Sequence, residues 1–126
     1  MHADEISKRK VESGLLGLQA PDSFWATPSV DMVGKVGGCG PGVLGDRLIP
    51  DTVYGICITN ACMIHDWCYR FVETTQDQAT ADMMFLHNML VIIHQKSKSK
   101  VLLFLRKLRV YKYYLAVSEF GKVCIS

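Results

Sequence analysis

The sequence predicts an all-α domain built around two antiparallel central helices. Apolar residues recur at near-helical spacing through residues 77–95 and again through residues 101–118. A short polar break, residues 73–76, separates the first of these segments from another apolar stretch before it, and helices joined by so short a connection pack in opposite directions. At 126 residues the chain is long enough for one domain, residues 1–126, with a modest core.

The N-terminal part of the chain is predicted to hold little regular structure. Residues 1–18 carry a weak amphipathic pattern that fits a short helix at best. Residues 19–52 contain all four prolines of the chain and most of its glycines, so we expect a loop. A loop of this length is uncommon, and one that is ordered usually has a function.

The segment over residues 52–72 is apolar and compatible with a helix, the first of the two central ones. Thr59 or Asn60 is expected to cap it, because a short side-chain oxygen can accept a hydrogen bond from a first-turn N–H. Asp77 is expected to cap the second central helix in the same way, and that helix is expected to run to residue 95.

A third, C-terminal helix is predicted over residues 101–118, after a polar turn at residues 95–100, and Gly121 is expected to end it. Basic residues gather in this part of the chain, namely Lys96, Lys98, Lys100, Arg106, Lys107, Arg109 and Lys112. They fit either a solvated helix face or a surface that contacts anionic lipid headgroups, which attract each Lys or Arg by about 1 kcal/mol. The formal net charge of +2 is too small to favour nucleic acid as a partner.

The sequence shows no pattern typical of a leader or a membrane span. Residues 1–10 are polar and charged, and the longest apolar runs, residues 89–93 and 101–105, are far too short to cross a bilayer. We therefore expect a protein that is cytoplasmic or released without a conventional leader. The five cysteines, an odd number, leave at least one thiol without a partner in the same chain.

A glycine-rich stretch is the first candidate for a functional site. Four of the six residues from Gly37 to Gly42 are glycine, which frees the backbone from side-chain sterics. The carbonyl groups of the alternate residues Gly38, Gly40 and Gly42 could then point toward one hard cation such as calcium. The same residues also fit an ordinary flexible loop.

The second candidate lies on the first central helix. At about 100° per residue, Cys62, His65, Asp66 and Tyr69 fall on one face of a helix that is otherwise apolar. Burying these polar groups without partners is costly. A histidine on such a face is more often a satisfied core residue, but the neighbouring Asp66 supplies the charged ligand that the glycine-rich stretch lacks.

A carboxylate on the second central helix can meet His65 if the two helices pack antiparallel. Such a carboxylate fixes the tautomer of the imidazole and leaves its other nitrogen free to take a proton. Asp82 lies among apolar residues and is the better candidate, whereas Asp77 is more simply a helix cap.

A zinc site is an alternative interpretation, because Cys57, Cys62, His65 and Cys68 are the usual zinc ligand types. Ligands at these spacings on one helix spread over a wide arc and suit a single tetrahedral ion poorly. A zinc site also leaves the glycine-rich stretch and Asp66 without a role.

The order and spacing of three motifs resemble the phospholipase A2 family. Residues 62–69, Cys-Met-Ile-His-Asp-Trp-Cys-Tyr, resemble its active-site helix, C-x-x-H-D-x-C-Y. Residues 38–42, Gly-Cys-Gly-Pro-Gly, are similar to its calcium loop, x-C-G-x-G, and residues 81–85, Ala-Asp-Met-Met-Phe, to the A-D-x-x-F helix of viral and microbial members. The likeness covers about residues 37–90 and is nearest to bacterial or prophage-type members. Ala61 departs from the secreted animal enzymes, which have a second Cys there.

The resemblance implies calcium-dependent hydrolysis of the sn-2 acyl ester of glycerophospholipids. In this scheme His65 is the general base, Asp82 orients it, Tyr69 supports Asp82, and the amide of Gly40 adds a donor to the oxyanion. The implied calcium ligands are Asp66 and the carbonyl oxygens of Gly38, Gly40 and Gly42.

The resemblance also implies a disulfide between Cys39 and Cys62, which would tie the calcium loop to the catalytic helix. The implied partner is a phospholipid membrane surface or micelle, with no nucleic acid. Four apolar residues line either an acyl channel or plain core, namely Trp25, Ile49, Val53 and Ile56. The alternative function is a non-catalytic calcium- and lipid-binding module on the same fold.

Overall fold

The computed structural model describes the backbone of residues 1–39 and 50–125 and the side chains of these residues up to residue 119. The described part is mostly helical, with six helices and one two-stranded sheet, which agrees with the all-α class predicted from the sequence. None of the described helices is both long and apolar enough to cross a membrane.

Three helices form the N-terminal part, where a single weak helix and a long loop were expected. Helix α1 (Ala3–Leu16) ends at Gly17, whose φ of 74° is the left-handed conformation that favours glycine at a helix end. Two short helices, α2 (Asp22–Ala26) and α3 (Ser29–Met32), follow directly after Pro21 and Pro28. Each proline fixes its own φ near the helical value, so the same residues that predict a loop also start a helical turn.

A β-hairpin replaces the first third of the predicted helix over residues 52–72. Strands β1 (Thr52–Val53) and β2 (Ile56–Cys57) pair antiparallel, and the two residues between them, Tyr54 and Gly55, both have positive φ. Such a two-residue turn matches the twist of the paired strands. Helix α4 (Thr59–Tyr69) begins only afterwards, with Ile58 rather than Thr59 or Asn60 at its N-cap.

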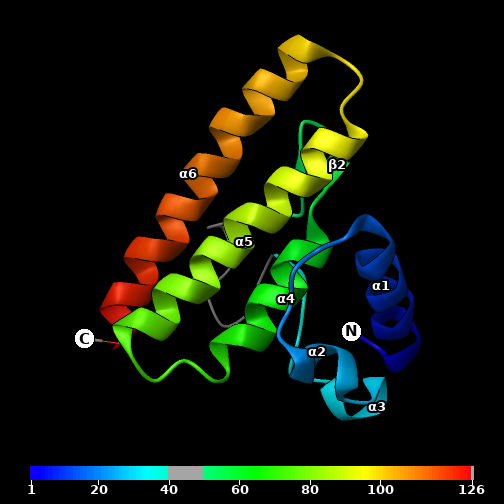
Figure 1. Cartoon of the computed structure of the whole chain (residues 1–126), viewed down its shortest axis with the longest axis vertical. Helices are drawn as coiled ribbons and strands as arrows, with labels where there is room; N and C mark the ends of the chain where they lie inside the picture. The colour runs from blue at the N-terminus through cyan, green and yellow to red at the C-terminus, as the bar shows by residue number, and fades with distance from the viewer. Residues whose placement is uncertain (40–49, 126) are drawn as a thin grey trace.

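Two long helices complete the fold. Helix α5 (Thr75–Lys96) runs back alongside α4, and α6 (Lys100–Ile125) packs along α5 in turn, so that α5 lies between the other two (Figure 1). The N-cap of α5 is Thr74, whose hydroxyl accepts from the Asp77 N–H at 3.0 Å, so Asp77 is not the cap. Helix α6 continues past Gly121, the expected end.

One hydrophobic core joins these elements and positions the centre of α4. Nine consecutive residues of this helix, 59–67, are buried, because α1 covers one side and α5 another. Polar side chains in this segment therefore sit inside the protein, where each needs a hydrogen-bond partner.

Candidate functional site

His65 lies in the core of the protein, near the centre of α4. Its side chain is 1% exposed, and its Nε2 lies 2.7 Å from Oδ1 of Asp82 on α5. The Phe85 ring, one turn further along α5, stacks on the imidazole with the ring centroids 4.5 Å apart. The imidazole is therefore held in its plane by an apolar ring and in its orientation by a carboxylate.

Asp82 accepts hydrogen bonds from three side chains. Besides His65, the Tyr69 hydroxyl donates to Oδ1 at 2.8 Å, and the Gln78 amide donates to Oδ2. When Asp82 is ionised it can only accept, and Nε2 of His65 then carries the proton of this hydrogen bond. The neutral imidazole then keeps Nδ1 as an acceptor, which is the arrangement that a general base needs.

Asp77, the other candidate partner of His65, lies elsewhere. It is exposed at the start of α5, where its Oδ2 accepts from the backbone N–H of Glu73 at 3.2 Å. The antiparallel packing brings Asp82 to His65 instead, since Asp82 lies on the side of α5 that faces α4.

Gln78 was not predicted from the sequence to take part in this site. Its amide nitrogen also donates to the Ser118 carbonyl at 3.3 Å, so it links Asp82 to α6. A signal was present, because Gln78 precedes Asp82 by four residues and such pairs share one face of a helix.

Asp66 is a second buried carboxyl group, next to His65 in the sequence. Its side chain is 7% exposed, and its Oδ2 accepts from the backbone N–H of Gly37 at 3.0 Å. Burial raises the pKa of Asp66 to about 7, and the hydrogen bond from Gly37 opposes this rise only in part. A nearby cation would favour the charged form of this carboxyl group and so offset the cost of burying it.

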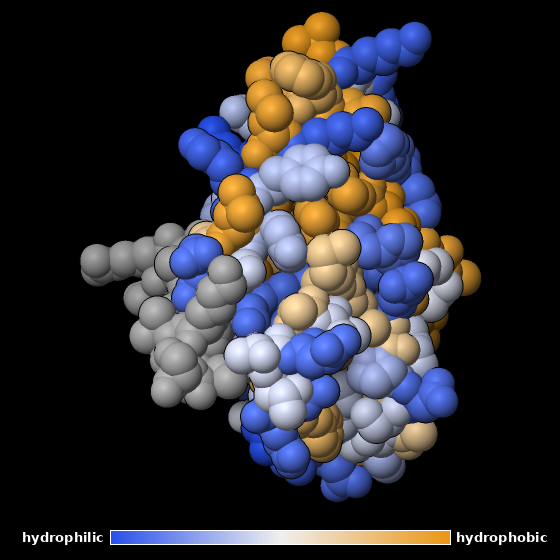
Figure 2. Space-filling model, turned by 60° about the vertical axis from the view of Figure 1, so that its left-hand side comes forward, coloured by the Kyte–Doolittle hydropathy of each residue, from blue (hydrophilic) through white to orange (hydrophobic). Residues whose placement is uncertain are grey.

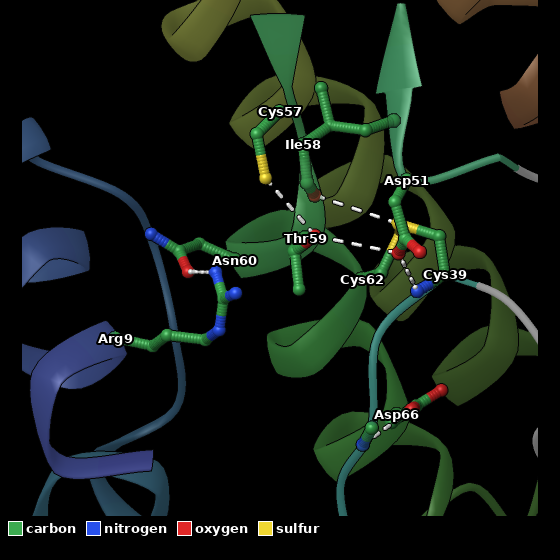
Figure 3. Close-up of a disulfide and its surroundings, with 10 residues drawn as sticks. Arg9, Cys39, Asp51, Cys57, Ile58, Thr59, Asn60, Cys62 and Asp66 are labelled. Atoms are coloured by element: carbon green, nitrogen blue, oxygen red, sulfur yellow. Dashed lines mark hydrogen bonds between the residues drawn. A yellow bond between two sulfur atoms is a disulfide. The ribbon is translucent and has the colours of Figure 1, made fainter. Parts of the chain in front are cut away.

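The disulfide predicted from the family likeness is confirmed. Cys39 and Cys62 are bonded, with their Cα atoms 5.0 Å apart, and this bond ties the segment before residue 40 to the first turns of α4 (Figure 3). Asp51 reinforces the attachment, because its Oδ1 accepts from the Cys39 N–H at 2.8 Å and from the Thr59 hydroxyl at 3.4 Å.

Gly38 has a steric reason to be glycine. A Cβ atom at this position would lie 2.8 Å from Oδ1 of Asp51, so this carboxyl group would have to move away from its hydrogen bonds with Cys39 and Thr59. Gly40 and Gly42, the other two predicted carbonyl ligands, lie outside the described residues.

Within the described residues, no group of three or more His, Cys, Asp or Glu side chains could hold a metal ion. A site made of one carboxylate and backbone carbonyls contains no such group, so Asp66 and Gly38 remain compatible with calcium.

The zinc alternative loses one ligand, because the Cys62 sulfur is in the disulfide. Cys57 is an exposed free thiol that contacts the Thr59 hydroxyl. Cys68 is a partly buried free thiol, and burial raises its pKa to about 11, so it is a neutral thiol near pH 7 rather than a thiolate ligand.

Three of the four residues that fit either an acyl channel or plain core belong to the described part of the chain. Val53 and Ile56 are paired across the hairpin and belong to the hydrophobic core, whereas Trp25 is 39% exposed on α2. Ile49 lies outside the described residues.

A separate apolar pocket of about 310 Å³ opens between the end of α4 and the start of α5, with Cys68 and Met84 in its wall.

Comparison with known proteins gives no relative: no family model, no curated protein and no solved structure matches this chain.

Proposed function

We propose that this protein is a calcium-dependent phospholipase A2 that hydrolyses the sn-2 acyl ester of glycerophospholipids. The observation that carries the proposal is the pair formed by His65 and Asp82, buried together and joined at 2.7 Å. Asp66 follows His65 on α4 and adds a second buried carboxyl group. The sequence motifs around all three residues resemble those of the phospholipase A2 family.

His65 would act as the general base. Its Nδ1 takes a proton from a water molecule, and the oxygen of that water attacks the ester carbonyl carbon. The imidazolium then gives the proton to the departing alcohol oxygen as the bond between the carbonyl carbon and that oxygen breaks. The products are a free fatty acid and a lysophospholipid.

Asp82 would orient His65 and stabilise the imidazolium that forms. Its position is itself fixed by the Tyr69 hydroxyl and the Gln78 amide, each of which donates to it. A carboxylate held from three sides cannot rotate away from the imidazole, so the base stays in one tautomer. Tyr69 and Gln78 are positioning residues in this scheme.

Asp66 would hold the calcium ion together with the carbonyl oxygen of Gly38, and with Gly40 and Gly42 by the family likeness. The donor set fits calcium, because a carboxylate and backbone carbonyls are hard oxygen ligands. When bound, calcium polarises an ester carbonyl and stabilises negative charge on its oxygen. The disulfide and Asp51 secure the start of the predicted calcium loop against α4.

The deciding experiment is release of fatty acid from vesicles of phosphatidylcholine labelled in the sn-2 chain, first with calcium and then with an excess of chelator. We expect release of the labelled chain with calcium and none with chelator or with magnesium. Full activity in chelator would refute the calcium mechanism. Binding of calcium and lipid without any release would instead identify a non-catalytic module.

A further inference from the structure

The outer face of α6 carries hydrophobic side chains that are exposed to solvent. On the core side of this helix Arg106, Val110 and Val117 are buried. We call the opposite set the outer stripe; its members, 47% to 70% exposed, are Val101, Phe104, Leu108, Tyr111 and Leu115. They follow one another at intervals of three and four residues, so they line one side of the helix. A continuous apolar stripe on a surface marks a contact site more often than scattered apolar residues do.

Basic side chains border the outer stripe on both sides. At about 100° per residue, Lys100 and Lys107 lie along one edge and Lys112 along the other. Figure 2 shows hydrophobic side chains gathered in the upper part of the molecule, where the N-terminal half of α6 lies, with long hydrophilic side chains projecting beside them. Glu119 is the only acidic residue in the sequence of α6. The partner of this face must therefore be apolar at its centre and negative at its edges.

A second copy of the chain fits this face poorly. If two outer stripes packed against each other, the lysines at their edges would meet lysines of the other copy, and like charges beside a helix seam oppose pairing. An anionic lipid surface satisfies both requirements, because acyl chains accept the apolar stripe while the headgroups attract the cations.

A hollow beside the outer stripe offers a place for one headgroup. It has a volume of about 370 Å³ and is lined by Tyr54, Leu105, Leu108, Arg109 and Lys112. The guanidinium carbon of Arg109 lies 5.3 Å from the centre of the Tyr54 ring, and Arg109 also donates to the Tyr54 hydroxyl at 3.1 Å. The two cations at this hollow therefore stand beside the apolar side chains that would enter the lipid.

We propose that the outer stripe of α6 docks on the surface of an anionic membrane, with Lys107, Arg109 and Lys112 at the headgroups. The choice of a lipid surface over an acidic protein rests on the proposed function; the docking itself does not require catalysis. The contact lies on α6, away from the core face that packs on α5, so docking leaves the packing around Asp82 unchanged.

The test is sedimentation of the full chain with vesicles of non-hydrolysable diether lipids, in chelator, so that catalysis plays no part. One set is phosphatidylcholine alone, and the other contains one third phosphatidylglycerol. We expect the protein to bind the anionic vesicles at least about tenfold more strongly. Lys107→Gln with Lys112→Gln should weaken this binding about 25-fold, since each cation contributes a factor of about five.

Leu108→Gln with Leu115→Gln should also weaken binding at least about tenfold, because two side chains no longer enter the lipid. The matched control is Leu15→Gln on α1, a leucine that is 84% exposed and lies outside the outer stripe. Loss of binding in this control, or equal binding to both vesicle types, would overturn the proposal. A dimer in solution that Leu108→Gln dissociates would overturn it too, since the stripe would then be a self-contact.

Hydrolysis of a short-chain phospholipid in free solution separates the two proposals. If the stripe variants keep this activity and lose only activity on vesicles, both proposals hold. If the wild-type protein hydrolyses no phospholipid but still binds anionic vesicles, the phospholipase proposal fails and the docking proposal stands.

Discussion

At the scale of single residues, the protein pairs its two buried carboxyl groups, Asp66 and Asp82, with hydrogen-bond donors. Asp82 receives three donors, and Asp66 receives the Gly37 N–H. A buried polar group without a partner costs about 1–3 kcal/mol, and a buried charge costs more. The Tyr69 and Gln78 donors hold the Asp82 carboxyl group against Nε2 of His65, so Nδ1 is the nitrogen that this carboxyl group leaves free.

Replacing His65 tests the base directly. His65→Gln should lower the rate of fatty-acid release by a factor of about 10² to 10⁴, because Gln cannot take up a proton near neutral pH. Gln can still donate to Asp82, so circular dichroism and the melting temperature should remain close to those of the wild type. Asp82→Asn should give a smaller loss, and Asp77→Asn, at an exposed position, should give none. Retained activity in His65→Gln would refute the phospholipase proposal.

Replacing Asp66 tests the calcium site. Asp66→Asn should lower calcium affinity at least about tenfold, measured by isothermal titration calorimetry, because the charged ligand is lost. The Asn side-chain oxygen can still accept from the Gly37 N–H, so the local fold should survive. Asp31→Asn, an exposed change on α3, is the control and should leave the affinity unchanged. If Asp66→Asn binds calcium as tightly as the wild type, Asp66 is not a ligand.

At the scale of elements, the disulfide and the hairpin hold the segment before residue 40 and the segment after residue 50 against α4. Cys39 is attached to α4 through Cys62. The Asp51 side chain accepts hydrogen bonds from the Cys39 N–H and from the Thr59 hydroxyl at the start of α4. The Asp51 carbonyl also accepts from the Ile58 N–H at 2.8 Å, directly before α4 begins. Cys39, in the predicted calcium loop, and Asp51 are thus both anchored to α4, the helix that also carries Asp66.

Removing the disulfide should weaken this anchorage. Cys39→Ser with Cys62→Ser should lower the free energy of unfolding in denaturant by about 3 kcal/mol, as expected for a bond that closes a loop of this length. Calcium affinity should fall as well, because the loop must then be ordered at the moment of binding. Cys57→Ser, which alters an exposed free thiol, should change neither quantity. Unchanged calcium affinity without the disulfide would show that the loop is positioned by other contacts.

At the scale of the whole molecule, Arg106 joins three parts of the fold. From α6 its guanidinium donates to the carbonyls of Val53 and Tyr54 in the hairpin and to the Ser97 hydroxyl after α5. Its side chain is 7% exposed, so these acceptors compensate a charge that has left water. The hairpin, which precedes α4, is held in this way by the last helix of the chain.

Removing Arg106 should therefore lower global stability. Arg106→Met keeps the apolar part of the side chain but leaves the Val53 and Tyr54 carbonyls without this donor, at a cost of about 2–4 kcal/mol in the free energy of unfolding. Lys112→Met, an exposed change on the same helix, should stay within about 0.5 kcal/mol of the wild type. Urea denaturation measures both. Equal stability of Arg106→Met and wild type would show that the hairpin is held by its apolar residues alone.

The sequence by itself determined the helical class, the two long helices and the residues that meet at the buried site. Apolar spacing predicts α5 and α6 because both bury one face over many turns. It also favours Asp82 over Asp77, because a carboxyl group among apolar residues must face inward and needs a partner. The disulfide followed from the family likeness rather than from spacing, and the structure contains it.

Only the tertiary structure decided the rest. The hairpin over residues 52–57 was not predicted from the sequence, because strands of two residues are too short to show a period. Arg106, from a distant part of the chain, stabilises it. The i, i+4 spacing of Gln78 and Asp82 was visible in the sequence, but the contact of Gln78 with Ser118 on α6 was not. The role of Asp51 was not predicted because its partner Cys39 lies across residues 40–49. Local pattern determines which residues are buried, but the hydrogen bonds of buried polar groups join segments far apart in sequence and form only when the chain has folded.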